Sequence, residues 1–255
     1  MSDSCQSVDD NASVLGRLLH ELSYAGKTIR QYRGGGRGYE NILTAEVLQG
    51  LDFLPRRAFM GAVLSSARGA DVARAQMISE IEDARFRLLP GSQYLAGSGD
   101  DHDGKLGVQP DGLIESPSAF LVLEAKSKRS SSFQPEQLAR EYVLALRDSG
   151  QRTPLLLLVL ASGPPVKVED HGKLSISEAI SLYLERVLDR AKGHSITTKE
   201  ALSRVEEVVC WITWQEISVT VELQREALQC PDPSVAATIE RLAGSVIRAI
   251  AWHGH

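Results

Sequence analysis

Three charged residues at the ends of two apolar segments could together do chemistry on a phosphate ester. Asp111 follows Pro110 within the first segment, and Glu124 and Lys126 end the second. Charged groups are unfavourable to bury, so charges at the ends of apolar strands need partners or a function. Two carboxylates with a lysine beside them can hold a divalent cation and position a water, which is what phosphodiester hydrolysis requires.

The two segments predict a β-hairpin whose register brings these charges together. They flank a short Ser-Pro turn. With the hairpin centred on that turn, the numbers of opposed residues add up to about 235, which places Asp111 opposite Glu124. Lys126 shares the face of Glu124 because strand side chains alternate with a period of two. Close carboxylates repel unless a cation lies between them, so we expect Mg²⁺ or Mn²⁺, with the Ala125 carbonyl as a further ligand.

A purely structural interpretation of the same residues is also open. Asp111 could belong to a Pro-Asp-Gly turn, and Glu124 and Lys126 could form an ordinary salt bridge at a strand end. The elements that follow favour the catalytic interpretation. Residues 134–146 have the pattern of a helix, and residues 154–160 form an apolar run typical of a strand covered on both faces. A hairpin, a crossover helix and a further strand indicate a mixed central β-sheet flanked by helices, hence an α/β fold.

The remaining chain is predicted to be mostly helical. Helices are expected at 14–24, 41–67 with a break at Pro55, 71–88, 175–191, 199–207, 217–228 and 234–252, with an edge strand at 208–214. We divide the chain into an N-terminal helical segment (1–70), a central core (71–165) and a mostly helical C-terminal extension packed on the core (166–255).

Composition indicates an ordinary protein of the cytoplasm. The chain has 255 residues, a formal net charge of −5, 43% hydrophobic and 24% charged residues. Its three cysteines have no metal-binding spacing and argue against a disulfide framework. The polar N-terminus does not resemble a secretory signal, and no apolar run is long enough to span a bilayer, so no membrane partner is expected.

A glycine-rich loop, Gly26–Tyr39, carries Lys27, Arg30, Arg33 and Arg37. Its Gly-Lys-Thr does not make a phosphate-binding P-loop, because Glu21 stands where that motif needs glycine. The loop is either a linker or a basic segment that contacts phosphates. An acidic run at 100–103 is interpreted as a solvated loop.

Pro110-Asp111 and Glu124-Ala125-Lys126, with the helix and apolar strand that follow, resemble the PD-(D/E)XK nuclease superfamily, which has a restriction-endonuclease-like fold. The resemblance covers residues 71–160. It implies that Asp111 and Glu124 bind the metal and that Lys126 positions the attacking water.

The resemblance also implies an acid from the preceding helix as a further metal ligand. Glu80 is the candidate, with Glu82, Asp83 and Glu40 as rivals. Some members carry Gln-x-x-x-Tyr on the helix after the hairpin, whereas here Gln137 and Tyr142 are five apart and do not share a face.

Of the residues on that helix, Gln134, Gln137 and Glu141 share one face. We carry over Gln137 as an active-site residue and expect Tyr142 to be a core tyrosine. Lys128, Arg129 and Arg140 are expected to contact the phosphates of the nucleic acid.

The sequence thus predicts a divalent-metal-dependent nuclease that acts on DNA, with RNA as an alternative substrate. By analogy with similar nucleases, it would act in a bacterial restriction or phage-defence system, as a homodimer or as a subunit of a larger complex. The alternative is a nuclease-like nucleic-acid-binding or scaffold subunit without catalytic turnover.

Overall fold

The computed structural model describes residues 38–96, 106–126 and 132–252. The described helices are α3 (Gly38–Phe53), α4 (Met60–Ser66), α5 (Asp71–Ser79), α6 (Gln137–Asp148), α7 (Ile176–Arg190), α8 (Thr198–Ser203), α9 (Val205–Val208), α10 (Trp214–Ala227) and α11 (Pro233–Trp252). The strands are β1 (Arg85–Leu88), β2 (Gln93–Ala96), β3 (Leu106–Val108), β4 (Gly112–Glu115), β5 (Ala119–Ala125), β6 (Ser132–Phe133), β7 (Thr153–Leu160), β8 (Val166–Val168), β9 (Gly172–Leu174) and β10 (Val209–Thr213).

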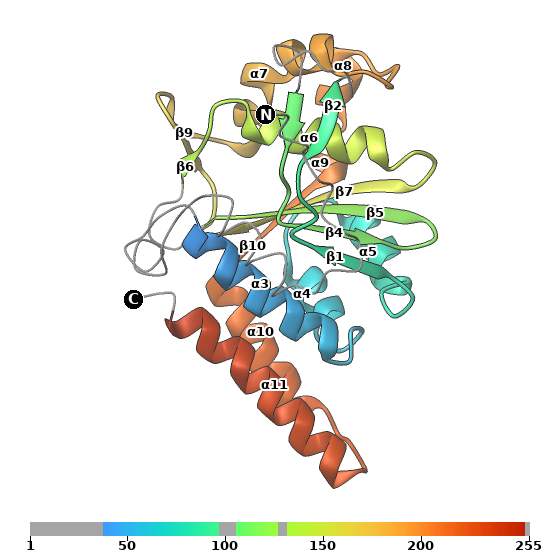
Figure 1. The fold of residues 1–255 in the computed structure, drawn as a ribbon, viewed down its shortest axis with the longest axis vertical. Helices are drawn as coiled ribbons and strands as arrows, with labels where there is room; N and C mark the ends of the chain where they lie inside the picture. Colours follow the sequence, from blue (N-terminus) through green and yellow to red (C-terminus); the bar gives the residue numbers. More distant parts are fainter. Residues whose placement is uncertain (1–37, 97–105, 127–131, 253–255) are drawn as a thin grey trace, which may run out of the picture.

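A five-stranded sheet in the order β1-β4-β5-β7-β10 forms the centre of the protein (Figure 1). The β1–β4 and β4–β5 pairs are antiparallel, whereas β5–β7 and β7–β10 are parallel. Helix α6 supplies the crossover between the two parallel strands β5 and β7, as parallel neighbours require. The predicted α/β fold with a mixed central sheet is therefore confirmed.

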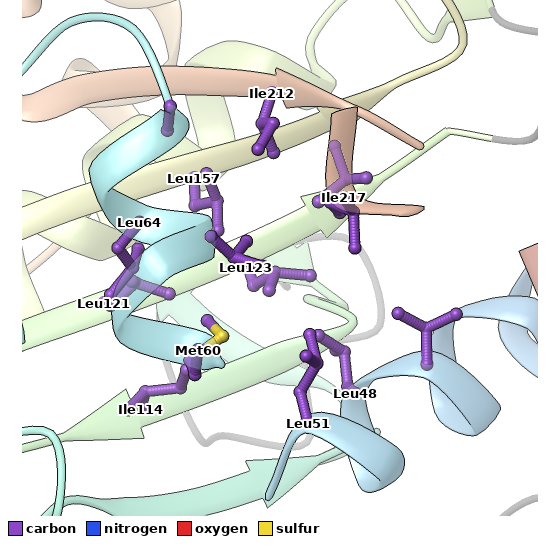
Figure 2. Close-up of a cluster of buried hydrophobic side chains, with 14 of the residues drawn as sticks. Leu48, Leu51, Met60, Leu64, Ile114, Leu121, Leu123, Leu157, Ile212 and Ile217 are labelled. Atoms are coloured by element: carbon purple, nitrogen blue, oxygen red, sulfur yellow. The ribbon is translucent and has the colours of Figure 1, made fainter. Parts of the chain in front are cut away.

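Alternate side chains of β5 enter two separate cores on the two faces of the sheet. Leu121 and Leu123 pack with α3, α4, α5, α10 and α11, and Figure 2 shows these leucines beside Leu48 and Met60. On the other face, Val122 packs with α6 and α7. Glu124 and Lys126 have the parity of Val122, so the sheet presents them to α6.

The predicted helix over 71–88 is wrong in its second half. Helix α5 ends at Ser79, and Arg85–Leu88 form β1, which pairs with β4 at the edge of the sheet. The apolar positions that suggested one long helix are all buried, including Met77, Ile81 and Ala84. The helical spacing therefore identified core residues correctly but did not show where the backbone leaves the helix.

Most other predicted elements are present with small shifts. The helix at 175–191 begins with a capping box between Ser175 and Glu178, and residues 209–213 form the expected edge strand β10. Two small sheets, β2-β3 and β6-β8-β9, were not expected. The predicted helix at 14–24, the basic residues of the glycine-rich loop and the acidic run at 100–103 lie outside the described residues.

Helices α10 and α11 form an antiparallel pair, in which α11 packs against α3 and α10 against α4 (Figure 1). An added Cβ at Gly50 of α3 would lie 2.3 Å from a methyl carbon of Val246 on α11, so a glycine is needed for this close approach. None of the helices in the described part of the chain is long and apolar enough to cross a membrane.

Candidate active site

The hairpin formed by β4 and β5 has the predicted register. Gly112 lies opposite Leu123 and Glu115 opposite Phe120. Asp111 lies just before β4, where its N–H donates to the Leu123 carbonyl at 3.0 Å. Its Oδ2 accepts a hydrogen bond of 2.7 Å from the buried N–H of Ala125, so the carboxylate is held at the strand end beside Glu124.

Glu124 is nearly inaccessible to solvent, and its carboxylate accepts hydrogen bonds from one ammonium group and one amide group. Lys126 Nζ donates to Glu124 Oε1 at 2.8 Å, and the side-chain amide of Gln137 donates to the same oxygen. Burial raises the pKa of Glu124, while Lys126 and Gln137 oppose that rise by stabilising the charged form. The structure thus brings together Asp111, Glu124, Lys126 and Gln137, all of which were predicted from the sequence.

A further acid, Glu141, belongs to this group and was not predicted as a site residue. It lies one turn after Gln137 on α6 and is 1% exposed. Burial, followed by the carboxylates of Glu124 and Asp111, raises its pKa well above that of a glutamate in water. Burial raises the pKa of both glutamates, and at Glu141 the neighbouring carboxylates add to that rise, whereas at Glu124 Lys126 opposes it. The four-residue spacing from Gln137 was the available sequence signal.

The end of β5 is fixed by two aromatic residues from distant segments. The indole N–H of buried Trp214, the first residue of α10, donates to the Lys126 carbonyl at 2.7 Å. The Lys126 ammonium lies 4.9 Å from the centre of the Phe133 ring, a cation–π distance. A capping box between Thr213 and Glu216 starts α10 at Trp214, so local helix chemistry sets the position of the indole.

The donor atoms at this strand end suit a hard divalent cation. Asp111, Glu124 and Glu141 contribute carboxyl oxygens from three elements, and carboxylates are the ligands that Mg²⁺ and Mn²⁺ prefer. Glu141 Oε2 is buried and has no hydrogen-bond partner within the described residues. In that part of the chain no three acidic, histidine or cysteine side chains are gathered closely enough to enclose an ion as they stand. Lys126 and Gln137 both donate to the Glu124 carboxylate in this arrangement.

Glu80, the predicted upstream ligand, lies at the opposite end of the hairpin. Its carboxylate accepts hydrogen bonds from the hydroxyls of Ser116 and Ser118 and from the Ser118 N–H. Ser118 and Glu124 are six steps apart along the strand, which is about 20 Å at 3.3 Å per residue. Glu80 therefore cannot share an ion with Glu124, and the prediction that it joins this site is wrong.

The rivals of Glu80 are not at the site either. Glu82 accepts a hydrogen bond of 2.8 Å from the N–H of Arg57, and Asp83 is exposed in the turn after α5. The side chain of Glu40 lies outside the described residues. Glu141 is thus the further acid that the structure brings to this end of β5.

The predicted nucleic-acid contacts divide into two groups. Lys128 and Arg129 lie outside the described residues. Arg140 lies on α6 beside the site and forms an ion pair with Glu136, while its Nη1 donates to the Gly107 carbonyl at 3.4 Å. Tyr142 is a core tyrosine, as expected, because it is buried and its hydroxyl donates to the Ala201 carbonyl at 2.6 Å.

No protein-family model, curated protein or solved structure matches this chain. Family and activity therefore have to be inferred from the site. The strongest feature for that purpose is the group of Asp111, Glu124, Lys126, Gln137 and Glu141, which we call the carboxylate cluster.

Proposed function

We propose that this protein is a divalent-metal-dependent nuclease that hydrolyses phosphodiester bonds in DNA, with a restriction-endonuclease-like core. The observation that carries the proposal is the convergence of three carboxyl groups and one lysine on a single face of the sheet. Asp111 comes from the start of β4, Glu124 and Lys126 from the end of β5, and Glu141 from α6. Burial of so many acids with a single lysine among the described neighbours is unfavourable without a further cation.

The metal-binding residues follow from the positions of the oxygen atoms. Asp111, Glu124 and Glu141 would hold Mg²⁺ or Mn²⁺, together with the carbonyl of Ala125. When bound, the ion would supply a Lewis acid that polarises the phosphoryl oxygens and lowers the pKa of the attacking water. Glu141 would give up its proton to act as a ligand, because cations compete with protons for a carboxylate.

Lys126 and Gln137 have separate roles in this proposal. The ammonium of Lys126 would hold the attacking water or the scissile phosphate by a charge-assisted hydrogen bond. Gln137 would orient the Glu124 carboxylate through the contact between its amide and Oε1. Trp214 fixes the backbone of Lys126, and the Phe133 ring lies beside its ammonium group. The ammonium would therefore be positioned before substrate binds.

The test is cleavage of a supercoiled plasmid with Mg²⁺ or Mn²⁺ and with EDTA. Asp111→Ala, Glu124→Ala and Lys126→Ala should each abolish metal-dependent cleavage. Glu80→Gln is the matched control, because it removes a carboxylate from the other end of the same hairpin. Unchanged cleavage in all three site variants would contradict the proposal.

A second function, a DNA-binding or scaffold subunit without turnover, is favoured by one contact. Lys126 and Gln137 both occupy Oε1 of Glu124, so the cluster is satisfied in part by its own residues. A protein that shifts DNA in a gel but never cleaves it under any metal condition would support this function instead.

A further inference from the structure

Three arginines from two helices gather around one glutamate beside the carboxylate cluster. Arg140 of α6 pairs with Glu136 one turn earlier. From α7, Arg186 Nε lies 3.2 Å from Glu136 Oε1, and Arg190 Nη1 lies 3.9 Å from Glu136 Oε2. Three positive charges against one negative charge leave this group, which we call the arginine row, with a net charge of +2.

The arginine row is open to solvent. The side chain of Arg186 is 64% exposed, and that of Arg190 is 37% exposed. Glu136 is the least accessible member, at 14%. Asp189 is three residues after Arg186 and therefore near it on the helix surface, but among the described residues the ion pairs of Arg186 and Arg190 are to Glu136 and not to Glu185 or Asp189.

The arginine row is continuous with the candidate active site. Glu136, the residue before α6, precedes Gln137, and Arg140 precedes Glu141, so the two lie about 100° around the helix from members of the carboxylate cluster, on the neighbouring face. Arg140 also donates to the carbonyl of Gly107 on β3, the strand that leads into Asp111. Both helices lie on the face of the sheet to which Glu124 points (Figure 1).

We infer that the arginine row binds the backbone phosphates of DNA next to the cleaved bond. This inference rests on the proposed nuclease function and names a surface that delivers its substrate. Guanidinium groups match phosphate oxygens with two parallel hydrogen bonds, and a protein of net charge −5 needs a local positive surface to bind DNA. Glu136 holds the three guanidinium groups near one another through its ion pairs. A phosphate could accept hydrogen bonds from guanidinium N–H groups that Glu136 does not use.

An ordinary structural role would be an ion-pair network that joins α6 to α7. The two roles predict opposite results for Glu136→Gln. If the network only joins the helices, loss of its single acid should leave DNA binding unchanged. If the row binds phosphate, the net charge rises from +2 to +3, so DNA affinity at low salt should rise by about threefold and the salt dependence should steepen.

The experiment measures binding of a fluorescent duplex DNA in EDTA by anisotropy, across a salt titration. Arg186→Gln with Arg190→Gln should weaken binding by about tenfold and reduce the slope of log K against log salt by about 1 to 2. Arg241→Gln is the matched control, because Arg241 is exposed on α11, which packs on the other face of the sheet. A single-stranded RNA of equal length, as a second probe, measures preference between the two nucleic acids.

The outcomes separate this inference from the nuclease proposal. Weaker DNA binding by the Arg186→Gln, Arg190→Gln double variant in EDTA, with unchanged binding by Arg241→Gln, supports phosphate binding by the arginine row. Equal binding by wild type and double variant, or no binding by wild type, overturns it. Asp111→Asn should lose cleavage without weakening DNA binding in EDTA, because it removes a negative charge beside the arginine row. A failed nuclease assay therefore leaves the binding result readable.

Discussion

The two ends of the β4–β5 hairpin hold carboxylates in opposite electrostatic conditions. At the turn, Glu80 accepts hydrogen bonds from Ser116 and Ser118, which lower its pKa to about 2. At the open end, Glu141 is buried beside other acids, and its pKa is raised. The turn end is therefore arranged to keep a carboxylate charged, whereas burial beside other acids makes a charged carboxylate unfavourable at the open end.

Under the proposed function, this difference separates a structural carboxylate, Glu80, from the acids of the carboxylate cluster. Glu80 ties the end of α5 to the hairpin turn through serine hydroxyls, which need no ligand. The open end places the carboxyl groups of Glu124, Glu141 and Asp111 near one another, and repulsion between buried like charges does not stabilise the fold. Perturbed acids of this kind are typical of sites with a function. The following changes test that difference, from the largest expected effect to the smallest.

The largest effect is expected for Glu141→Gln, which keeps the shape of the side chain and removes one acid. Metal-dependent cleavage should fall by about 100-fold, since weaker support of a metal site already costs 10- to 100-fold. The thermal midpoint in EDTA should not fall, because a neutral amide replaces an acid that burial disfavours. Differential scanning fluorimetry with a plasmid-cleavage assay measures both. A cleavage rate equal to wild type would remove Glu141 from the site.

Gln137→Ala should have an intermediate effect. It removes the amide that donates to buried Glu124, and hydrogen bonds to charged groups contribute about 1.5–3 kcal/mol. We expect a loss of that order in the free energy of unfolding by urea and a reduced cleavage rate. Gln134→Ala changes an exposed glutamine in the segment just before α6; it is the control and should change neither.

Trp214→Phe should have a smaller effect on stability. It deletes the indole N–H that donates to the Lys126 carbonyl, a buried bond of 2.7 Å, at a cost of about 1–3 kcal/mol for the unsatisfied acceptor. Because this bond fixes the end of β5, cleavage should also weaken. Trp252→Phe, at an exposed position on α11, should match wild type in urea unfolding and in cleavage.

The smallest effect on cleavage is expected for Glu80→Gln, which should cut DNA at the wild-type rate. Its effect lies in the pH dependence of stability. The folded-state pKa of Glu80 is lowered to about 2, so its stabilising contribution is present above the pKa of the unfolded chain, near 4.5, and is lost as pH falls toward 2. The urea midpoints of wild type and Glu80→Gln should therefore differ at pH 7 and converge as pH falls below 4.5.

Features that depend on neighbouring residues could be predicted from the sequence. The hairpin register follows from the turn and the period of two, so Asp111, Glu124 and Lys126 were placed together correctly. The local patterns of the apolar run at 154–160 and of the helix before it also predicted a crossover connection to a further strand of the sheet, which is the parallel β5–β7 pair. Gln137 was implied by the resemblance to the nuclease superfamily, and helical spacing placed it on one face with Glu141.

Features that depend on contacts between distant residues could not be predicted from the sequence. Strand β1 is defined by pairing with β4, and the helical spacing of Met77, Ile81 and Ala84 pointed to a continuing helix. Glu80 was assigned to the site because it lay on the preceding helix, yet nothing local shows which end of the hairpin that helix reaches. Glu141 was on the correct face, but its raised pKa arises from burial and from acids of other elements.

Binding of Mn²⁺ by calorimetry, in the absence of DNA, tests the central claim most directly. Wild type and Glu80→Gln should bind the ion with the same affinity, whereas Asp111→Asn and Glu124→Gln should each weaken binding by at least about tenfold. Equal Mn²⁺ affinity in all four proteins, or a loss confined to Glu80→Gln, would contradict the assignment of the metal site to the open end of the hairpin.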